Sequence, residues 1–292
     1  LIVAAIREHE DVLAAVLIEP VMVNPMTYLK AVAPKAYLQK IRAACTETGC
    51  ALIFDEVMTS RLAPGGAQEL IGVIPDLTTF GKYIGGGFPI GAFGGTKHWM
   101  ERHDPFHPQT INSGGTFNQN ALCMAAATAV FEQLWSPVQC IEHNARGERL
   151  RDAINELAKQ QNVPCQACGT GSLITLIWQN RKVINDDDDD TSKHRLDIAT
   201  AAAVYQAPTL FWFHMLLRHD FLAGSPKLNY LTLPTVLKDE DYERFLAALA
   251  EFFTAHKELL AMLAAETAPG IAPTQEELDV RETITFPYPP AR

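Results

Sequence analysis

Short apolar runs alternate with amphipathic segments along the first half of the chain. The apolar runs predict strands at 12–20, 51–54 and 77–80, and the amphipathic segments predict helices at 1–9 and 35–48. Strands of a parallel sheet are buried on both faces, so their sequences form continuous apolar runs of this kind. The alternation therefore predicts an α/β fold with a mostly parallel sheet.

The pattern changes after Asn162. Before it, a long helix is predicted from about Asn120 to residue 161, with a break at Pro137. After it, the sequence predicts strands at 172–178 and 228–233 and helices at 210–217 and 238–264. We therefore expect a larger domain at 1–161, a smaller α+β domain at 162–264, and an extended, proline-rich tail at 265–292.

The composition argues against several classes of protein. Hydrophobic residues make up 48% of the 292 positions, and the formal net charge is −10. Five acidic residues form one run, Asp186–Asp190, which we interpret as a solvated loop. The sequence has no basic stripe for nucleic acid and no apolar run near the ~20 residues of a membrane helix. No targeting pattern is visible, so we expect a cytoplasmic location.

The cysteine and histidine patterns lead us to expect no metal site. Cys165 and Cys168 form one C-x-x-C pair, but the second pair or histidines of a zinc site do not follow closely. We interpret them as small buried or half-buried thiols on a strand, with metal or redox use as the alternative. His98, His103 and His107 lack the spacing of a zinc-protease helix, and a surface helix end is the better interpretation.

Asp55 and Lys82 each follow a predicted buried strand. Ligands of open α/β sheets bind beyond the carboxyl ends of the strands, so both residues are well placed for function. The alternative for Asp55 is a carboxylate that caps the following turn. For Lys82, apolar surroundings would favour a neutral, nucleophilic amine. Its alternative is a lysine whose stem covers apolar surface while the ammonium reaches water.

The glycines near Lys82 do not form a nucleotide-binding P-loop. That motif needs glycine where Asp76 stands and serine or threonine where Tyr83 stands. We expect the run at 85–87 to permit tight turns instead.

Three segments then resemble one family in the same order. They are "LIFDEVMTSR" at 52–61, "DLTTFGKYIGGGFPIGAFGG" at 76–95 and "SGGTFNQNALCMAA" at 113–126. They resemble class III aminotransferases, which are fold type I enzymes that use pyridoxal 5'-phosphate (PLP). The greatest likeness is to the glutamate-1-semialdehyde 2,1-aminomutase branch, and it extends to about residue 264.

The resemblance implies roles for individual residues. Lys82 matches the catalytic lysine that holds PLP as an aldimine and later moves the substrate proton. Asp55 matches the aspartate that pairs with the pyridinium nitrogen of the cofactor. A carboxylate there keeps the ring nitrogen protonated, so that the ring withdraws electrons from the substrate. Val57 matches the residue that packs on one face of the ring.

Further matches involve the cofactor phosphate and a second subunit. Thr116, with Gly115, matches a phosphate contact that the family supplies from the neighbouring subunit, so the resemblance implies a homodimer with a shared active site. Asn24 matches an asparagine near the cofactor in the aminomutase branch. The partners implied are a small amino donor and a carbonyl acceptor.

The family carries a long N-terminal portion before the segment that matches Leu1. We therefore expect this chain to be the interior of a longer chain, or a trimmed form, with an incomplete large domain and an open PLP site. The expected function is amino transfer between an amino acid or amine and a carbonyl compound. The alternatives are intramolecular transfer by an aminomutase, or an inactive fragment that acts as a scaffold.

Overall fold

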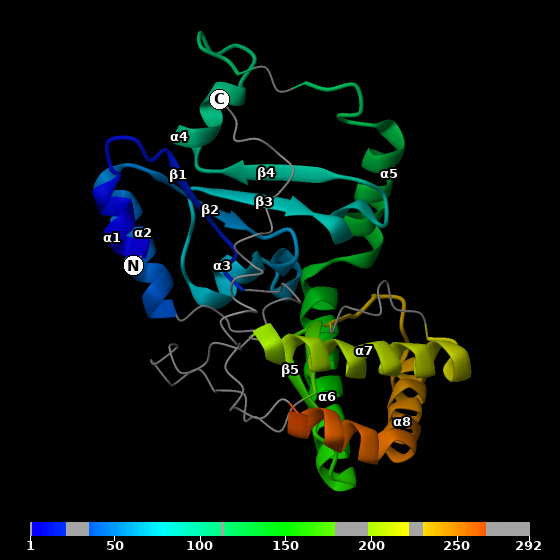
Figure 1. The fold of residues 1–292 in the computed structure, drawn as a ribbon. Helices are drawn as coiled ribbons and strands as arrows, with labels where there is room; N and C mark the ends of the chain where they lie inside the picture. Colours follow the sequence, from blue (N-terminus) through cyan, green and yellow to red (C-terminus); the bar gives the residue numbers. More distant parts are fainter. Residues whose placement is uncertain (1, 22–34, 112–113, 179–197, 222–229, 267–292) are drawn as a thin grey trace.

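The computed structural model describes residues 2–21, 35–111, 114–178, 198–221 and 230–266. These residues form two units (Figure 1). One holds a four-stranded sheet with helices α1 to α5, and the other holds a three-stranded sheet with helices α6 to α8. The acidic run at 186–190 and Asn24 lie outside the described residues. The tail predicted at 265–292 lies outside them from residue 267 on, and residues 265 and 266 belong to α8.

The larger sheet is mostly parallel, as expected. Its strands follow the order β1-β2-β3-β4; their bounds are β1 (Ala15–Ile18), β2 (Ala51–Asp55), β3 (Leu77–Gly81) and β4 (Gly91–Gly95). The strands β1, β2 and β3 run parallel, and β4 pairs antiparallel with β3. The apolar runs did not predict β4, because its sequence is rich in glycine.

The expectation that the first strand is buried on both faces is wrong for β1. Leu17, in the middle of β1, is 64% exposed. This strand stands at one end of the sheet order and pairs only with β2 among the described residues. By contrast, the middle of β2 is buried, with Leu52 and Phe54 at 0% exposure.

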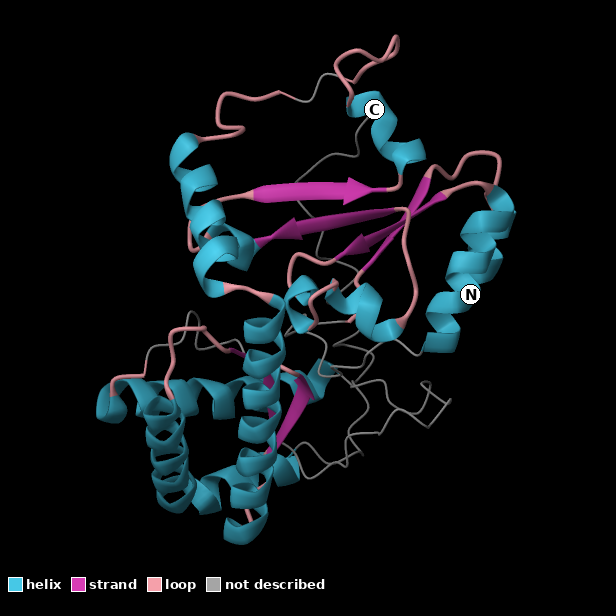
Figure 2. Ribbon diagram, turned by 180° about the vertical axis from the view of Figure 1, so that it is seen from behind, coloured by secondary structure: helices cyan, strands magenta, loops and turns pink. Residues whose placement is uncertain are grey.

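Helices flank this sheet (Figure 2). They are α1 (Ile2–Glu8), α2 (Lys35–Thr48), α3 (Gly66–Ile71), α4 (Lys97–Met100) and α5 (Ala121–Ala129). Short helical turns are η1 (Thr59–Leu62), η2 (Lys82–Gly85), η3 (Glu101–His103) and the π-helical η4 (Val130–Leu134). Leu38 and Ile41 of α2 pack in one core with Leu52 and Phe54 of β2. The amphipathic pattern of α2 thus fixes its apolar side against the sheet.

The second unit has its own core. Its elements are α6 (Pro137–Gln161), β5 (Gln166–Thr170), β6 (Leu173–Ile177), α7 (Ile198–His219), β7 (Tyr230–Thr232) and α8 (Asp239–Glu266). The three strands are antiparallel, in the order β5-β6-β7. Ile154 of α6 joins Phe211 of α7 and Phe252 of α8 in this core. The domain boundary expected at residue 162 stays a prediction.

Helix α6 begins where the sequence indicated. Pro137 occupies its first turn, and Ser136 and Gln139 form a capping box, in which each side chain bonds the backbone N–H of the other residue. Asn162 ends the helix in the left-handed conformation, with φ of 52°. Cys165 is buried just before β5 and Cys168 is half-buried on it, and neither forms a disulfide, which confirms their interpretation as small packed residues.

A buried hydrogen-bond network joins the two units. Arg61 of η1 donates through Nη2 to the carbonyl oxygen of Leu233, and the same atom lies 2.8 Å from Nε2 of His143 on α6. Asn144 donates to the carbonyl oxygen of Arg61 at 2.8 Å. Burial lowers the pKa of Arg61 to about 10, so the guanidinium stays charged at neutral pH. Burial first, and the nearby Arg61 second, lower the pKa of His143 to about 4. The imidazole is therefore neutral.

None of the helices in the described part of the chain combines the length and the apolar character that a bilayer crossing requires.

Candidate active site

The carboxylate of Asp55 is fixed at the carboxyl end of β2. The parallel register places Asp55 opposite Thr79 of β3. Its Oδ1 atom accepts hydrogen bonds from the backbone N–H of Val57 at 3.0 Å and from the hydroxyl of Thr79 at 3.2 Å. The residue therefore caps its turn, as the alternative interpretation predicted. Within the described residues, Oδ2 accepts no hydrogen bond and remains available to a ligand.

Lys82 begins the turn that follows β3. It adopts a φ of 55°, in the left-handed region, which costs a residue other than glycine about 1 kcal/mol. Gly81 and Gly86, on either side of η2, take extended and left-handed conformations. The surrounding fold thus holds this backbone in an unfavourable conformation, as is common at functional sites.

The environment of Lys82 agrees with the alternative expectation, in which the ammonium reaches water, and not with apolar enclosure. Its side chain is exposed rather than enclosed by apolar residues. The neighbouring glycines and apolar residues of the sequence shape the backbone of the turn. They do not cover the amine, which stays accessible to a small molecule.

Val57 lies beside this turn. A Cβ atom added at Gly81 would be 3.3 Å from Cγ1 of Val57, so the isopropyl group lies close to the backbone that leads into Lys82. Asp55 is the last residue of β2 and Val57 lies in the loop that follows, and β3 pairs with β2. The structure thus brings these three predicted residues to the same edge of the sheet.

Glu56 is structural. It is fully buried, and its carboxylate accepts hydrogen bonds from the backbone N–H groups of Ala67 and Gln68 at the start of α3. Burial raises its pKa, and these two backbone bonds oppose the rise. These hydrogen bonds of Glu56 connect the segment between Asp55 and Val57 to the start of α3.

Gly115 and Thr116 lie elsewhere, in an exposed loop before α5. The backbone N–H of Asn118 donates to the carbonyl oxygen of Gly115 at 2.9 Å, and Asn120 caps α5. Neither Gly115 nor Thr116 hydrogen bonds with Asp55 or Lys82 in the described structure. The residues that follow Thr116 line an open pocket of about 1110 Å³, and Ile84 and Phe117 are among its lining residues.

Thr79 is the contact that the sequence analysis missed. Its hydroxyl holds the Asp55 carboxylate. The available signal was the pairing of the two predicted strands, since parallel register places a residue near the end of β3 opposite Asp55. The register itself could not be fixed from two short apolar runs.

With the geometry established, sequence comparison places the chain in a family. Residues 2–205 match the class III aminotransferase family. This span covers most of the chain, and the chain belongs to that family, whose members depend on PLP. Its fold is that of the fold type I PLP enzymes.

Individual relatives include both transaminases and aminomutases. The chain is 36% identical over 88% of its length to the β-phenylalanine transaminase of Variovorax paradoxus, and covers 55% of that protein. It is 34% identical over 84% of its length to a glutamate-1-semialdehyde 2,1-aminomutase of Alkaliphilus oremlandii, covering 53% of it. The chain therefore spans about half the length of the curated relatives it matches.

Solved structures of transaminases are also similar to this chain. The β-phenylalanine aminotransferase of V. paradoxus aligns with a TM-score of 0.73 at 35% identity, covering 88% of this chain and 56% of that one. An ω-transaminase of Sphaerobacter thermophilus aligns with a TM-score of 0.71 at 34% identity, covering 86% and 54%.

Proposed function

We propose that the protein is a PLP-dependent aminotransferase that moves an amino group between an amino acid or amine and a carbonyl compound. The observation that carries this proposal is the edge shared by β2 and β3. There the carboxylate of Asp55 is held by Thr79 with Oδ2 open, and Lys82 presents an exposed amine. This donor set fits the ring nitrogen and the aldehyde of PLP. Because the chain spans half of its relatives, the activity is proposed for the whole protein.

Each residue has a distinct role in this proposal. PLP, when bound, supplies an electron-withdrawing ring that stabilises negative charge at the substrate carbon. Lys82 holds the cofactor through Nζ and moves the substrate proton, which requires an accessible amine. Oδ2 of Asp55 accepts a hydrogen bond from the protonated ring nitrogen and favours its charge. Val57 packs against one face of the ring, and Thr79 positions Asp55.

The proposal includes a homodimer with a shared site. In it, Gly115 and Thr116 bind the cofactor phosphate of the other subunit. The apolar side chains near this loop support the assembly, since Phe117 is 86% exposed and Leu122 of α5 is 70% exposed. A patch of this kind is typical of a surface that another protein covers. Asn24 is proposed to lie near the cofactor.

Two functions remain as alternatives to the proposed aminotransferase activity. Intramolecular transfer is favoured by the aminomutase relatives, whose identities are as high as those of the transaminases. A scaffold without activity is favoured by the exposed strand β1. We also propose a cytoplasmic location, which is supported by the absence of disulfides among the six cysteines, since disulfides are rare in reducing compartments.

Absorbance spectra with added PLP test the proposal. We expect a near-visible band that borohydride reduction makes permanent, with the cofactor attached covalently to the chain. Lys82→Ala should abolish the attachment, whereas Lys97→Ala, which removes an exposed lysine of α4, should not. If only a chain extended at its N-terminus gives the band, the present chain is a fragment. If neither chain does, the scaffold alternative holds.

A further inference from the structure

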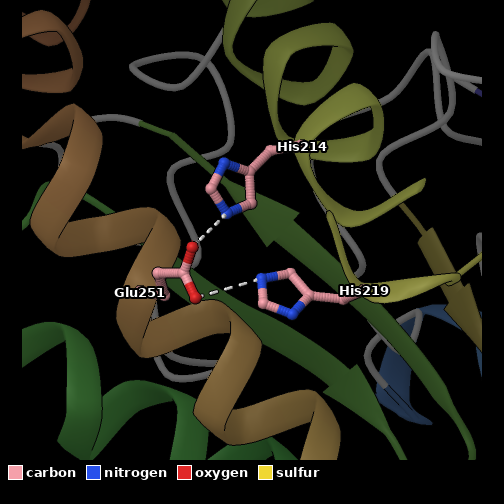
Figure 3. Close-up of side chains that lie close together, drawn as sticks. All are labelled: His214, His219 and Glu251. Atoms are coloured by element: carbon pink, nitrogen blue, oxygen red, sulfur yellow. Dashed lines mark ion pairs between the residues drawn. The ribbon is translucent and has the colours of Figure 1, made fainter. Parts of the chain in front are cut away.

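Two histidines and a glutamate converge between α7 and α8, far from Lys82 in the sequence (Figure 3). His214 and His219 come from the end of α7, and Glu251 comes from α8. Nε2 of His214 is 3.9 Å from Oε1 of Glu251, and Nε2 of His219 is 3.4 Å from Oε2. One ligand atom of each residue lies within 4.8 Å of the others. All three side chains thus face one point.

The fold holds these side chains in place. His214 packs against Phe252 of α8, with ring centroids 5.3 Å apart. His219 is the last residue of α7, where Asp220 adopts a φ of 56° and the backbone N–H of Phe221 donates to the carbonyl oxygen of Met215 at 3.1 Å. This tight end of the helix lets two histidines five positions apart approach the same carboxylate.

The Nε2 atoms of both imidazoles lack the hydrogen-bond partners that buried polar atoms usually have. His214 is only 7% exposed, and neither its Nε2 nor that of His219 makes a hydrogen bond within the described residues. Buried nitrogen atoms without a partner are uncommon and costly. Both unpaired atoms belong to the same cluster and face the Glu251 carboxylate. A cation there would satisfy both lone pairs and the negative charge.

We propose that His214, His219 and Glu251 form a binding site for a divalent transition metal ion, with Zn²⁺ as the best match. Two imidazoles and one carboxylate form a known zinc ligand set, which leaves a fourth position for water. Metal–ligand bonds of about 2.0–2.2 Å in a tetrahedral site place the ligand atoms roughly 3.4 Å apart. The two imidazole nitrogens lie 3.4 and 3.9 Å from the two carboxylate oxygens, and one ligand atom of each residue lies within 4.8 Å of the others, so the set must draw together to reach this spacing. This site is separate from the proposed aminotransferase site.

Two neighbours bear on the proposal. Nε2 of His256 lies 3.3 Å from Nδ1 of His214. If His214 carries its proton on Nδ1, His256 accepts it and Nε2 is left free for the metal, an arrangement common around metal-bound histidines. Arg218 approaches Oε1 of Glu251 at 3.6 Å, but its side chain is 67% exposed and can turn into solvent when the metal binds.

Zn²⁺ titration of the chelator-treated chain tests the site. Isothermal calorimetry near neutral pH should give one tight site, and Glu251→Gln and His219→Gln should each weaken binding by at least about 100-fold. His256→Phe keeps a ring but removes the acceptor, and should weaken binding by roughly 10- to 100-fold. Glu258→Gln and His98→Gln are matched controls, because both residues are exposed and lie outside the cluster.

Co²⁺ spectra separate this site from the cysteines. Binding through imidazole and carboxylate gives visible bands without the strong near-ultraviolet absorption of thiolate ligands. A thiolate band, failure of the wild type to bind, or equal affinity in Glu251→Gln and Glu258→Gln would each overturn the proposal. Circular dichroism checks that each variant is folded. If His219→Gln is not, Glu251→Gln and His256→Phe decide the outcome.

Discussion

Protonation of His143 should destabilise the junction between the two units. The side chain is 5% exposed, and its pKa is lowered from 6.5 to about 4, chiefly by burial and next by Arg61. Below pH 6.5 the unfolded chain takes up a proton that the folded chain does not. Stability therefore falls as the pH drops from 6.5 toward 4, and becomes constant below that.

The magnitude follows from the difference between the two pKa values. The full difference corresponds to about 3 kcal/mol, and about 2 kcal/mol of it is lost already at pH 5. That is a substantial part of the stability of an ordinary domain. Over this range Arg61 stays charged, since its pKa is about 10. The Nη2 atom of Arg61 lies 2.8 Å from Nε2 of His143. After burial, the positive charge of Arg61 is the largest cause of the lowered pKa of His143.

Urea unfolding at about pH 7.5 and pH 5 measures this effect. Tryptophan fluorescence follows the unfolding of the chain, and one of its four tryptophans, Trp135, is buried at the junction, with its ring centroid 5.6 Å from that of His143. The comparison is with His143→Gln, whose amide oxygen can still accept from Arg61 but does not titrate. Between the two pH values, the wild type should lose about 2 kcal/mol more than the variant.

His98→Gln is the control, because His98 is exposed on α4, and it should show the pH dependence of the wild type. If His143→Gln loses as much stability as the wild type, the imidazole does not remain neutral in the folded chain. The reasoning from burial and Arg61 would then be wrong.

Other predictions concern the site and the packing. Asp55→Asn should weaken PLP binding in a fluorescence titration by about tenfold or more, because an amide cannot hold the charged ring nitrogen, and should leave thermal unfolding without PLP unchanged. Thr79→Val should weaken it less, since about 1 kcal/mol of hydrogen bonding to Asp55 is lost; an effect as large as that of Asp55→Asn would contradict a positioning role. Gly147→Ala should destabilise the chain in urea by about 1–3 kcal/mol, because the new Cβ would overlap the carbonyl oxygen of Gly171. A gain in stability would instead reflect helix propensity alone.

The strands and helices with regular apolar patterns could be predicted from the sequence. The run predicted at 51–54 forms the first four residues of β2, and the break predicted at Pro137 is the start of α6. The pattern failed for β4, whose glycines carry no apolar signal, and for β1, whose apolar run predicted two buried faces. An apolar run shows that a strand has apolar side chains on both faces. It does not show which neighbouring elements cover those faces, because that depends on the assembled sheet.

The sequence predicted where the candidate site lies in the fold, but it did not predict what surrounds each of its residues. Asp55 and Lys82 follow strands, and that was enough to place both at one edge of the sheet. The accessible amine of Lys82 was not predictable from its neighbours in the sequence, because residues of one turn differ in burial: Lys82 is exposed, whereas Ile84 and Gly85 are buried. Thr79 required the register between two strands, which depends on packing across the whole sheet.

The junction connects the two units to the turn that carries Lys82. Tyr83, the next residue, packs on Trp135 with centroids 5.1 Å apart, and Trp135 packs on His143. Arg61, which bonds to the same imidazole, follows the loop of Asp55. Packed contacts of this kind couple residues energetically when they share a partner. A substitution of His143 should therefore affect the segments that follow both β2 and β3. His143 contacts the first through Arg61 and the second through Trp135 and Tyr83. The same contacts anchor the residue that follows the left-handed backbone of Lys82, whose own side chain is exposed.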